Sequence, residues 1–217
     1  VEYLKELFDG AEDVSKKSKL AGVLATCVSL NDIKQFEKIL QTHSPSEDDI
    51  TIMTGVAFGL GYRNDLEQGT KNILRNINTS ETTDQEFLYC VTYVLAQLGM
   101  VDDLKSVLDS KGTPPQDGIW AGDNSGYMLL YESAIQGICD SETPRAVQAL
   151  KEILKDFEEI PEDSKSIILS RKKNRFLSEI PMLKAYLTGT EKPSGIKSSA
   201  AIGLGCCARM ICLGKIS

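Results

Sequence analysis

The sequence contains very little histidine and tryptophan, and it lacks a long apolar run. Only one His and one Trp occur among its 217 residues. General-base catalysis would have to rest on His43 alone, so a site with a nucleophile, a base and an orienting group is not expected. The longest apolar candidate, residues 200–213, is interrupted by Arg209 and by glycines, whereas a membrane-spanning helix needs roughly 20 apolar residues. The sequence favours a soluble, non-catalytic protein.

Positive charge is also scarce in this chain. Lys and Arg total 24 against 31 Asp and Glu, which gives a net charge of -7. A chain with this balance has no overall attraction for a phosphate backbone, so nucleic acid is not an expected partner. Hydrophobic residues make up 41% and charged residues 25%, as in ordinary globular proteins. We therefore expect a folded chain with enough length for a sizeable core.

The six cysteines show neither a metal-binding pattern nor a disulfide framework. Three lie inside apolar helical patterns, where a thiol behaves as a small hydrophobe: Cys27, Cys90 and Cys139. The other three contain no CxxC pair and have no histidine nearby: Cys206, Cys207 and Cys212. We predict reduced, structural cysteines, no metal and no cofactor. Reduced cysteines favour a reducing compartment, either the cytoplasm or the interior of an organelle.

A short phrase returns three times in the first half of the chain. Each copy consists of a small-residue apolar run, a tight turn and an aspartate, followed by a second apolar stripe. The aspartates are Asp32, Asp65 and Asp103, which stand 33 and 38 residues apart. This period is typical of repeats built from two helices. We interpret each aspartate as an N-cap or first-turn acid of the second helix.

The apolar residues on both sides of this phrase have helical spacing. In the second helices they are predicted to face the core: Ile33, Phe36, Ile39, Leu40, Leu66, Ile73, Leu74, Leu104, Val107 and Leu108. Two first helices are predicted to begin at Ser46 and Thr83, each with an acid three residues later. Their apolar faces include Phe58 and contain small residues that let neighbouring helices approach closely: Gly55, Ala57, Gly59 and Ala96.

A fourth helix pair is predicted over residues 127–154, with Thr143 as the cap and Pro144 at the first helical position of its second helix. Residues 144–154 read Pro-Arg-Ala-Val-Gln-Ala-Leu-Lys-Glu-Ile-Leu. This segment resembles the second helix of HEAT-like repeats of the phycobilisome-lyase type, and residues 57–61 resemble the first. The repeats predict an all-α fold, an α-solenoid of four to five antiparallel helix pairs. The resemblance implies that these pairs are HEAT-like.

The pattern changes after residue 158, so residues 1–158 are predicted to form the repeats and 159–217 a set of C-terminal helices. A longer helix beginning near Asp163 should be kinked or ended by Pro181. Residues 188–195 then have the composition of a linker. The helix that follows copies the apolar phrase of the repeats and is interpreted as a partial final repeat. An uncapped end of this kind predicts a partner or a continuation of the chain.

Two segments are predicted to bind a partner. The longest irregular stretch, residues 110–126, holds Trp120, and Tyr127 and Tyr131 follow it; aromatic residues dominate interface hot spots. Alternatively, Trp120 folds back over the helices and covers them. The second segment is a basic run that follows the acidic residues 156–163: Arg171, Lys172, Lys173 and Arg175. Such a run is alternatively a solvated helix face.

These features predict a non-catalytic scaffold, an adaptor or a subunit of a larger assembly, with protein partners. The resemblance to phycobilisome-lyase repeats implies an alternative, a bilin lyase-like factor or chaperone that handles a pigment-bearing protein. The pigment contacts would then be Trp120, Tyr127 and Cys139, and no residue carries over as catalytic. A third possibility is a peripheral structural subunit of a photosynthetic or other membrane complex. The sequence alone leaves these three functions open.

Overall fold

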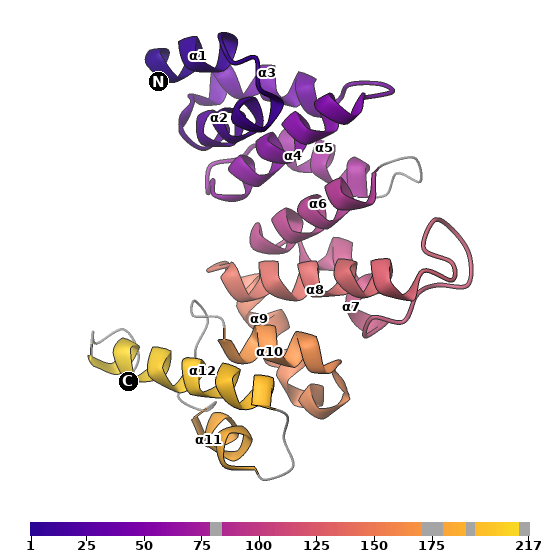
Figure 1. Ribbon diagram of the computed structural model, residues 1–217, viewed down its shortest axis with the longest axis vertical. Helices are drawn as coiled ribbons and strands as arrows, with labels where there is room; N and C mark the ends of the chain where they lie inside the picture. The colour runs from indigo at the N-terminus through magenta and orange to yellow at the C-terminus, as the bar shows by residue number, and fades with distance from the viewer. Residues whose placement is uncertain (79–83, 171–179, 190–193, 213–217) are drawn as a thin grey trace.

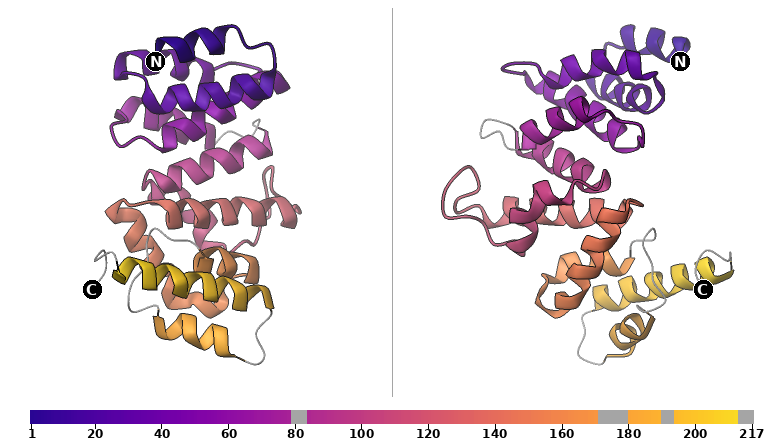
Figure 2. Two further views of the ribbon diagram at one scale, coloured as in Figure 1. Left: turned by 60° about the vertical axis from the view of Figure 1, so that its left-hand side comes forward. Right: turned by 180° about the vertical axis from the view of Figure 1, so that it is seen from behind.

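The computed structural model describes residues 1–78, 84–170, 180–189 and 194–212, and these residues form helices and connecting loops without any strand. The predicted all-α class is therefore confirmed. The helices pack in two rows (Figures 1 and 2). In the first row each helix packs against the next: α2 (Val14–Cys27), α4 (Glu47–Gly61), α6 (Gln85–Gln97), α8 (Asn124–Asp140), α10 (Glu162–Ser170) and α12 (Ser194–Cys212).

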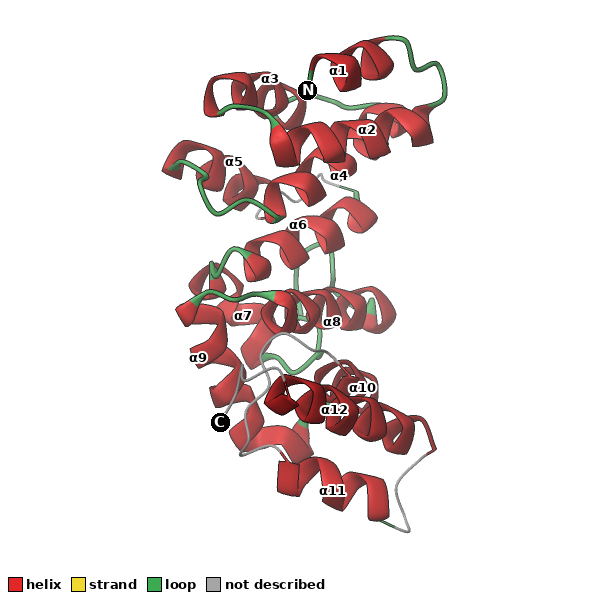
Figure 3. Ribbon diagram, turned by 90° about the vertical axis from the view of Figure 1, so that its left-hand side faces the viewer, coloured by secondary structure: helices red, strands yellow, loops and turns green. Residues whose placement is uncertain are grey.

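The second row lies along one side of the first, as Figure 3 shows. Its members are α3 (Leu30–Leu40), α5 (Gln68–Asn78), the 3-10 helix η1 (Val101–Leu104) with α7 (Lys105–Asp109), and α9 (Pro144–Ile153). Three further elements complete the described fold: α1 (Glu2–Asp9), η2 (Leu154–Glu159) and α11 (Ile180–Thr188). α1 packs against α2, and α11 packs against α12 at the other end.

Four first-row helices begin in the same way. A side-chain oxygen at the N-cap accepts the backbone N–H three residues on, which satisfies a donor that the helix leaves unpaired. The caps are Asp13, Ser46, Asp84 and Asp123, which stand 33, 38 and 39 residues apart. Ser46 also forms the reciprocal capping box with Asp49. The cap of α6 is Asp84, so the start predicted at Thr83 was wrong by one residue.

A close contact between neighbouring helices depends on glycine, as the small residues predicted. A Cβ atom at Gly59 of α4 would stand 2.1 Å from the carbonyl oxygen of Gly22 on α2. The hydroxyl of Ser18 donates to the carbonyl of Thr51 (2.6 Å), and that of Thr26 donates to the carbonyl of Gly59 (3.2 Å). Each hydrogen bond joins residues 33 positions apart, so α2 and α4 run parallel and in register.

The predicted core stripes are buried or partly buried, with one exception. Ile33, Phe36, Leu40, Leu66, Leu74, Leu104 and Val107 are buried, and Ile39, Ile73 and Leu108 pack against them. Phe58, which was assigned to the same kind of face, is 44% exposed. Its ring stacks on Tyr93 of α6 and meets Tyr62 edge-on, and these contacts leave it partly open to solvent.

Two of the three repeated aspartates occupy the predicted position in a helix start. Asp32 lies in the first turn of α3, whose cap is Ser29, and Asp103 lies in the first turn of η1. Asp65 precedes α5 and pairs with Arg63 (2.7 Å), and Asp103 also pairs with Arg75 (2.7 Å). The prediction was wrong for Asp65, whose carboxylate has an arginine partner, a stronger attraction than backbone N–H groups alone.

The C-terminal helices are described only in part. Pro181 lies in the first turn of α11, where its missing N–H costs nothing, and the stretch between α10 and α11, over which the longer helix was predicted, lies outside the described residues. α12 begins at Ser194, inside the predicted linker. The basic run of residues 171–175 lies outside the described residues. None of the described helices combines the length and the apolar character that crossing a membrane requires.

Three cysteines have different exposures, and we expect them to react differently. Cys27 is exposed at the end of α2, whereas Cys139 is buried and Cys90 is half-buried. Burial raises the pKa of Cys90 to about 12, which leaves almost none of the reactive thiolate at pH 8. Iodoacetamide should therefore modify Cys27 in the folded protein, and Cys90 and Cys139 only in urea. Peptide mass spectrometry measures this order, and rapid native labelling of Cys90 would contradict it.

Candidate functional site

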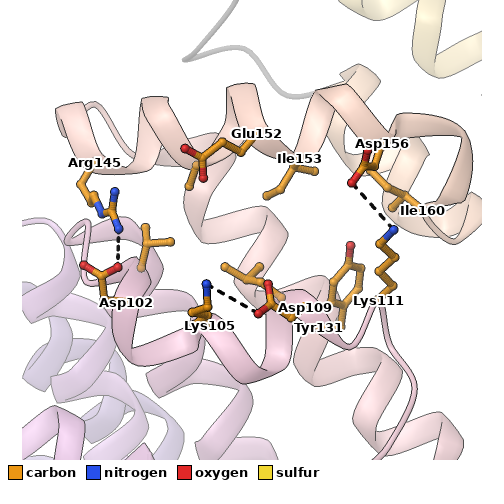
Figure 4. A pocket seen from close by; sticks show the side chains of 13 residues that line it. Asp102, Lys105, Asp109, Lys111, Tyr131, Arg145, Glu152, Ile153, Asp156 and Ile160 are labelled. Carbon is orange, nitrogen blue, oxygen red and sulfur yellow. Dashed lines mark hydrogen bonds and ion pairs between the residues drawn. The ribbon is translucent and has the colours of Figure 1, made fainter.

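A cleft of about 370 Å³ opens between η1, α7 and α9, with α8 beneath it (Figure 4). Its inner wall is apolar and is formed by Val101, Leu108, Ala149, Ile153 and Ile160. Its rim is charged on both sides: Asp102, Lys105, Asp109, Lys111, Arg145, Glu152 and Asp156. An apolar interior with a charged rim is the usual composition of a site that binds another molecule.

The rim charges are held in ion pairs that remain accessible. Arg145 at the start of α9 pairs with Asp102 of η1 and so connects two segments across the cleft. Lys111 pairs with Glu159 and lies 3.9 Å from Asp156. In each pair the hydrogen bond is the main cause that holds the pKa of the acid below its usual range and raises that of the base. All of these groups are therefore charged at neutral pH.

Exposed ion pairs contribute little to stability, because water screens them. The side chains of Arg145 and Asp102 are 53% and 74% exposed. Lys105 and Asp109 stand 3.8 Å apart and are also exposed. A bound partner can therefore replace one member of such a pair at small cost. The rim offers both signs of charge to a partner. A partner that binds these charges does not disturb the apolar packing beneath them.

Tyr131 rises from α8 into this cleft, and its hydroxyl points between the two walls (Figure 4). The residue is only 2% exposed, and burial raises its pKa to about 12, so the hydroxyl carries its proton at neutral pH. Within the part of the chain that the structure describes, this hydroxyl has no protein hydrogen-bond partner, and it is open to water in the cleft, since the buried side-chain atoms without a partner are Gln97 Oε1 and Ser164 Oγ. A hydroxyl that faces a cleft in this way can donate to a bound ligand in place of water.

Trp120 and Tyr127, which the sequence predicted as partner contacts, pack together inside the protein. Their ring centroids stand 6.0 Å apart, and the ring centroid of Tyr89 of α6 lies 5.8 Å from that of Trp120. Trp120 is 9% exposed and Tyr127 is 5% exposed. In this structure Trp120 thus covers the helices, the alternative role considered for it. A direct contact of these two rings with a partner stays a prediction.

The remaining sequence candidates fall at separate places. Cys139 is buried in α8, and His43 is exposed in the loop between α3 and α4. The four basic residues predicted to dock a partner lie outside the described residues. Of the predicted partner contacts that the structure describes, Tyr131 alone lines the cleft.

Sequence reasoning missed the charged rim. Asp102 and Arg145 are 43 residues apart, and only the packing of η1 beside α9 brings them together. Lys105 and Asp109 carry a local signal, because opposite charges four residues apart pair on a helix. That signal indicates an exposed helix face and does not reveal a cleft.

The chain matches no protein-family model, no curated protein and no solved structure. The resemblance to HEAT-like repeats therefore stays a prediction.

Proposed function

We propose that this protein is an α-solenoid scaffold with HEAT-like helix pairs, and that it binds a segment of a protein partner in the cleft between α7 and α9. The regular spacing of the four first-row caps supports the solenoid. So do the hydrogen bonds between residues 33 positions apart. In a solenoid each repeat contacts mainly its neighbours, and the stacked second helices form an extended binding surface.

The observation that carries the proposal is the unpartnered hydroxyl of Tyr131 in an apolar cleft with a rim of both charges. A polypeptide segment suits this composition. Its backbone carbonyl can accept the Tyr131 proton, its apolar side chains fit the inner wall, and its charged side chains meet the rim. The role is that of a scaffold, an adaptor or a subunit of an assembly.

Photo-cross-linking from inside the cleft tests this function. The side chain of Lys105 is replaced by p-benzoylphenylalanine, and the protein is irradiated in an extract of the cells that make it. The matched control carries the same group at Lys34, an exposed residue of α3 in the same row of helices. We expect one protein to be cross-linked from position 105 and not from position 34. Mass spectrometry identifies it.

A second variant, Tyr131→Phe, removes only the hydroxyl. It should lower the yield of that cross-link several-fold, since the lost hydrogen bond contributes about 1 kcal/mol. The absence of any product specific to position 105 would refute the proposal. A product that absorbs visible light would instead support the pigment-handling function that the resemblance implies.

A further inference from the structure

The rim of the cleft between α7 and α9 has more acids than bases. The described residues that line the cleft include three bases and four acids, and the acids are Asp102, Asp109, Glu152 and Asp156. One carboxylate is therefore in excess. Charged groups at a binding surface select partners of complementary charge, so the arrangement of these groups indicates which charge a bound segment should carry.

Each base on the rim already has an acidic partner. The ion pairs are those of Arg145 with Asp102, Lys105 with Asp109, and Lys111 with Glu159 and Asp156. The first and the last of these join the two walls, at opposite ends of the cleft (Figure 4). An acidic side chain of a partner would gain little here, because it would only replace an acid that is already present.

Glu152 differs from the other acids on the rim, because it forms no ion pair within the described part of the chain. Its carboxylate accepts one hydrogen bond, from the side-chain amide of Gln148 (2.9 Å). The charge of Glu152 contributes to the raised pKa of Arg145 without a direct contact. A carboxylate has about four acceptor positions, so Glu152 can accept further donors. It lies on the α9 wall, between the two ion pairs that join the walls (Figure 4).

The hydroxyl of Tyr131 indicates where the backbone of a bound segment would lie. The residue is 2% exposed, and its hydroxyl points between the two walls (Figure 4) without a protein partner among the described residues. A backbone carbonyl can accept its proton. Ala149 and Ile153 of α9 line the cleft beside Glu152. The aliphatic stem of a lysine or an arginine can pack on such an apolar wall while its charged end reaches the rim.

We propose that the partner segment in the cleft carries a basic side chain, lysine or arginine, whose charged end binds Glu152. The stem of this side chain covers the apolar wall of α9, and Tyr131 donates to a backbone carbonyl of the same segment. An acidic residue in that place would put two carboxylates together. This inference rests on the proposed function, and it adds the charge that the partner must present.

Fluorescence anisotropy with three labelled peptides tests the inference on the full chain. The probes are fluorescein-labelled Gly-Leu-Lys-Leu-Gly, Gly-Leu-Gln-Leu-Gly and Gly-Leu-Glu-Leu-Gly, which differ only in the central side chain. We expect the lysine peptide to bind about fivefold more tightly than the glutamine peptide, since a charge-assisted contact at a partly shielded site changes affinity by this order. The glutamate peptide should bind more weakly than the glutamine peptide.

Reversing the charge of one residue locates the site. Glu152→Lys should reverse the order, so that the glutamate peptide binds most tightly, and it should leave the affinity for the glutamine peptide within about twofold. Glu12→Lys is the matched control, because Glu12 is an exposed residue before α2, outside the cleft, and the net charge changes equally. This variant should keep the original order. Circular dichroism confirms that both variants are folded.

Several results would overturn the inference. Equal binding of the lysine and glutamate peptides would show that Glu152 does not select a charge. A reversal by Glu12→Lys as large as that by Glu152→Lys would indicate attraction by net charge alone. Absence of binding by all three peptides would also refute it. The cross-linking experiment tests the proposed function separately: a product specific to position 105, together with peptide binding that ignores charge, would leave the scaffold function in place.

Discussion

Replacement of Arg63 by methionine should lower the free energy of unfolding by about 3 kcal/mol. Arg63 is almost fully buried, with its side chain 7% exposed. Its Nη1 donates to the carbonyls of Val28 (2.7 Å), Ala25 (3.2 Å) and Thr26 (3.3 Å). These carbonyls belong to the end of α2, where the helix itself offers no N–H partner. Methionine fills similar space and leaves them unpaired.

The loss of stability comes mainly from the carbonyls that are left unpaired and less from the broken ion pair. Asp65, the acidic partner of Arg63, is 54% exposed, so water solvates its carboxylate after the substitution. Arg63→Lys should restore only part of the stability, because one ammonium cannot reach the carbonyls and Asp65 with the geometry of a guanidinium. Urea denaturation followed by circular dichroism measures both variants.

Arg145→Met is the matched control for this prediction. Arg145 also pairs with an aspartate, Asp102, but both side chains are exposed, and exposed pairs contribute little. The stability of the Arg145→Met variant should stay close to that of the unsubstituted protein. If Arg63→Met unfolds at the same urea concentration as this control, water donates hydrogen bonds to the carbonyls at the end of α2. Our interpretation of Arg63 is then wrong.

Gly59→Ala should also destabilise the protein by about 3 kcal/mol, although alanine is the better helix former. The added methyl group would lie 2.1 Å from the carbonyl oxygen of Gly22 and 2.8 Å from the carbonyl carbon of Gly22. Both are backbone atoms, so no side-chain rotation relieves the clash. α2 and α4 would have to separate by about 1 Å, which loosens the close packing between them. The midpoint of urea denaturation measures the loss.

The control for this prediction is Gly69→Ala in α5. A Cβ atom at Gly69 meets no other atom within 4 Å, so only helix propensity changes. This variant should be slightly more stable, by about 0.5 kcal/mol. Equal stability of the two alanine variants would show that α2 and α4 are further apart in solution than in this structure.

Much of the helical framework could be predicted from local sequence. Ser46, Thr143 and Pro144 marked helix starts that the structure confirms, because capping depends on residues within one turn. The glycines Gly55 and Gly59 indicated close packing for a similar reason, since a missing side chain is visible in the sequence itself. The predicted start of α6 was one residue too early, because both Thr83 and Asp84 have side chains suited to an N-cap.

Predictions about surfaces were less successful, because helical spacing does not tell which sides of a helix have neighbours. Phe58 belongs to an apolar stripe of α4, yet it is 44% exposed, because Tyr93 of α6 and Tyr62 cover only part of it. For Trp120 the sequence left open a partner contact and a position folded back over the helices, and in the structure its ring packs against Tyr89 and Tyr127. Burial depends on segments far away in the chain, and the local sequence pattern does not indicate which segments these are.

The sequence by itself determined the all-α class, most helix starts and the residues that bring α2 and α4 together, since each depends on neighbours within about one helical turn or on the size of one side chain. Only the tertiary structure decided how Arg63 reaches a helix end 35 residues away, how Arg145 meets Asp102, and on which side of α8 the cleft opens. These features need two or three helices in fixed relative positions. The packing of whole helices sets those positions. A contact between any single pair of residues contributes only a small part of the stabilising free energy.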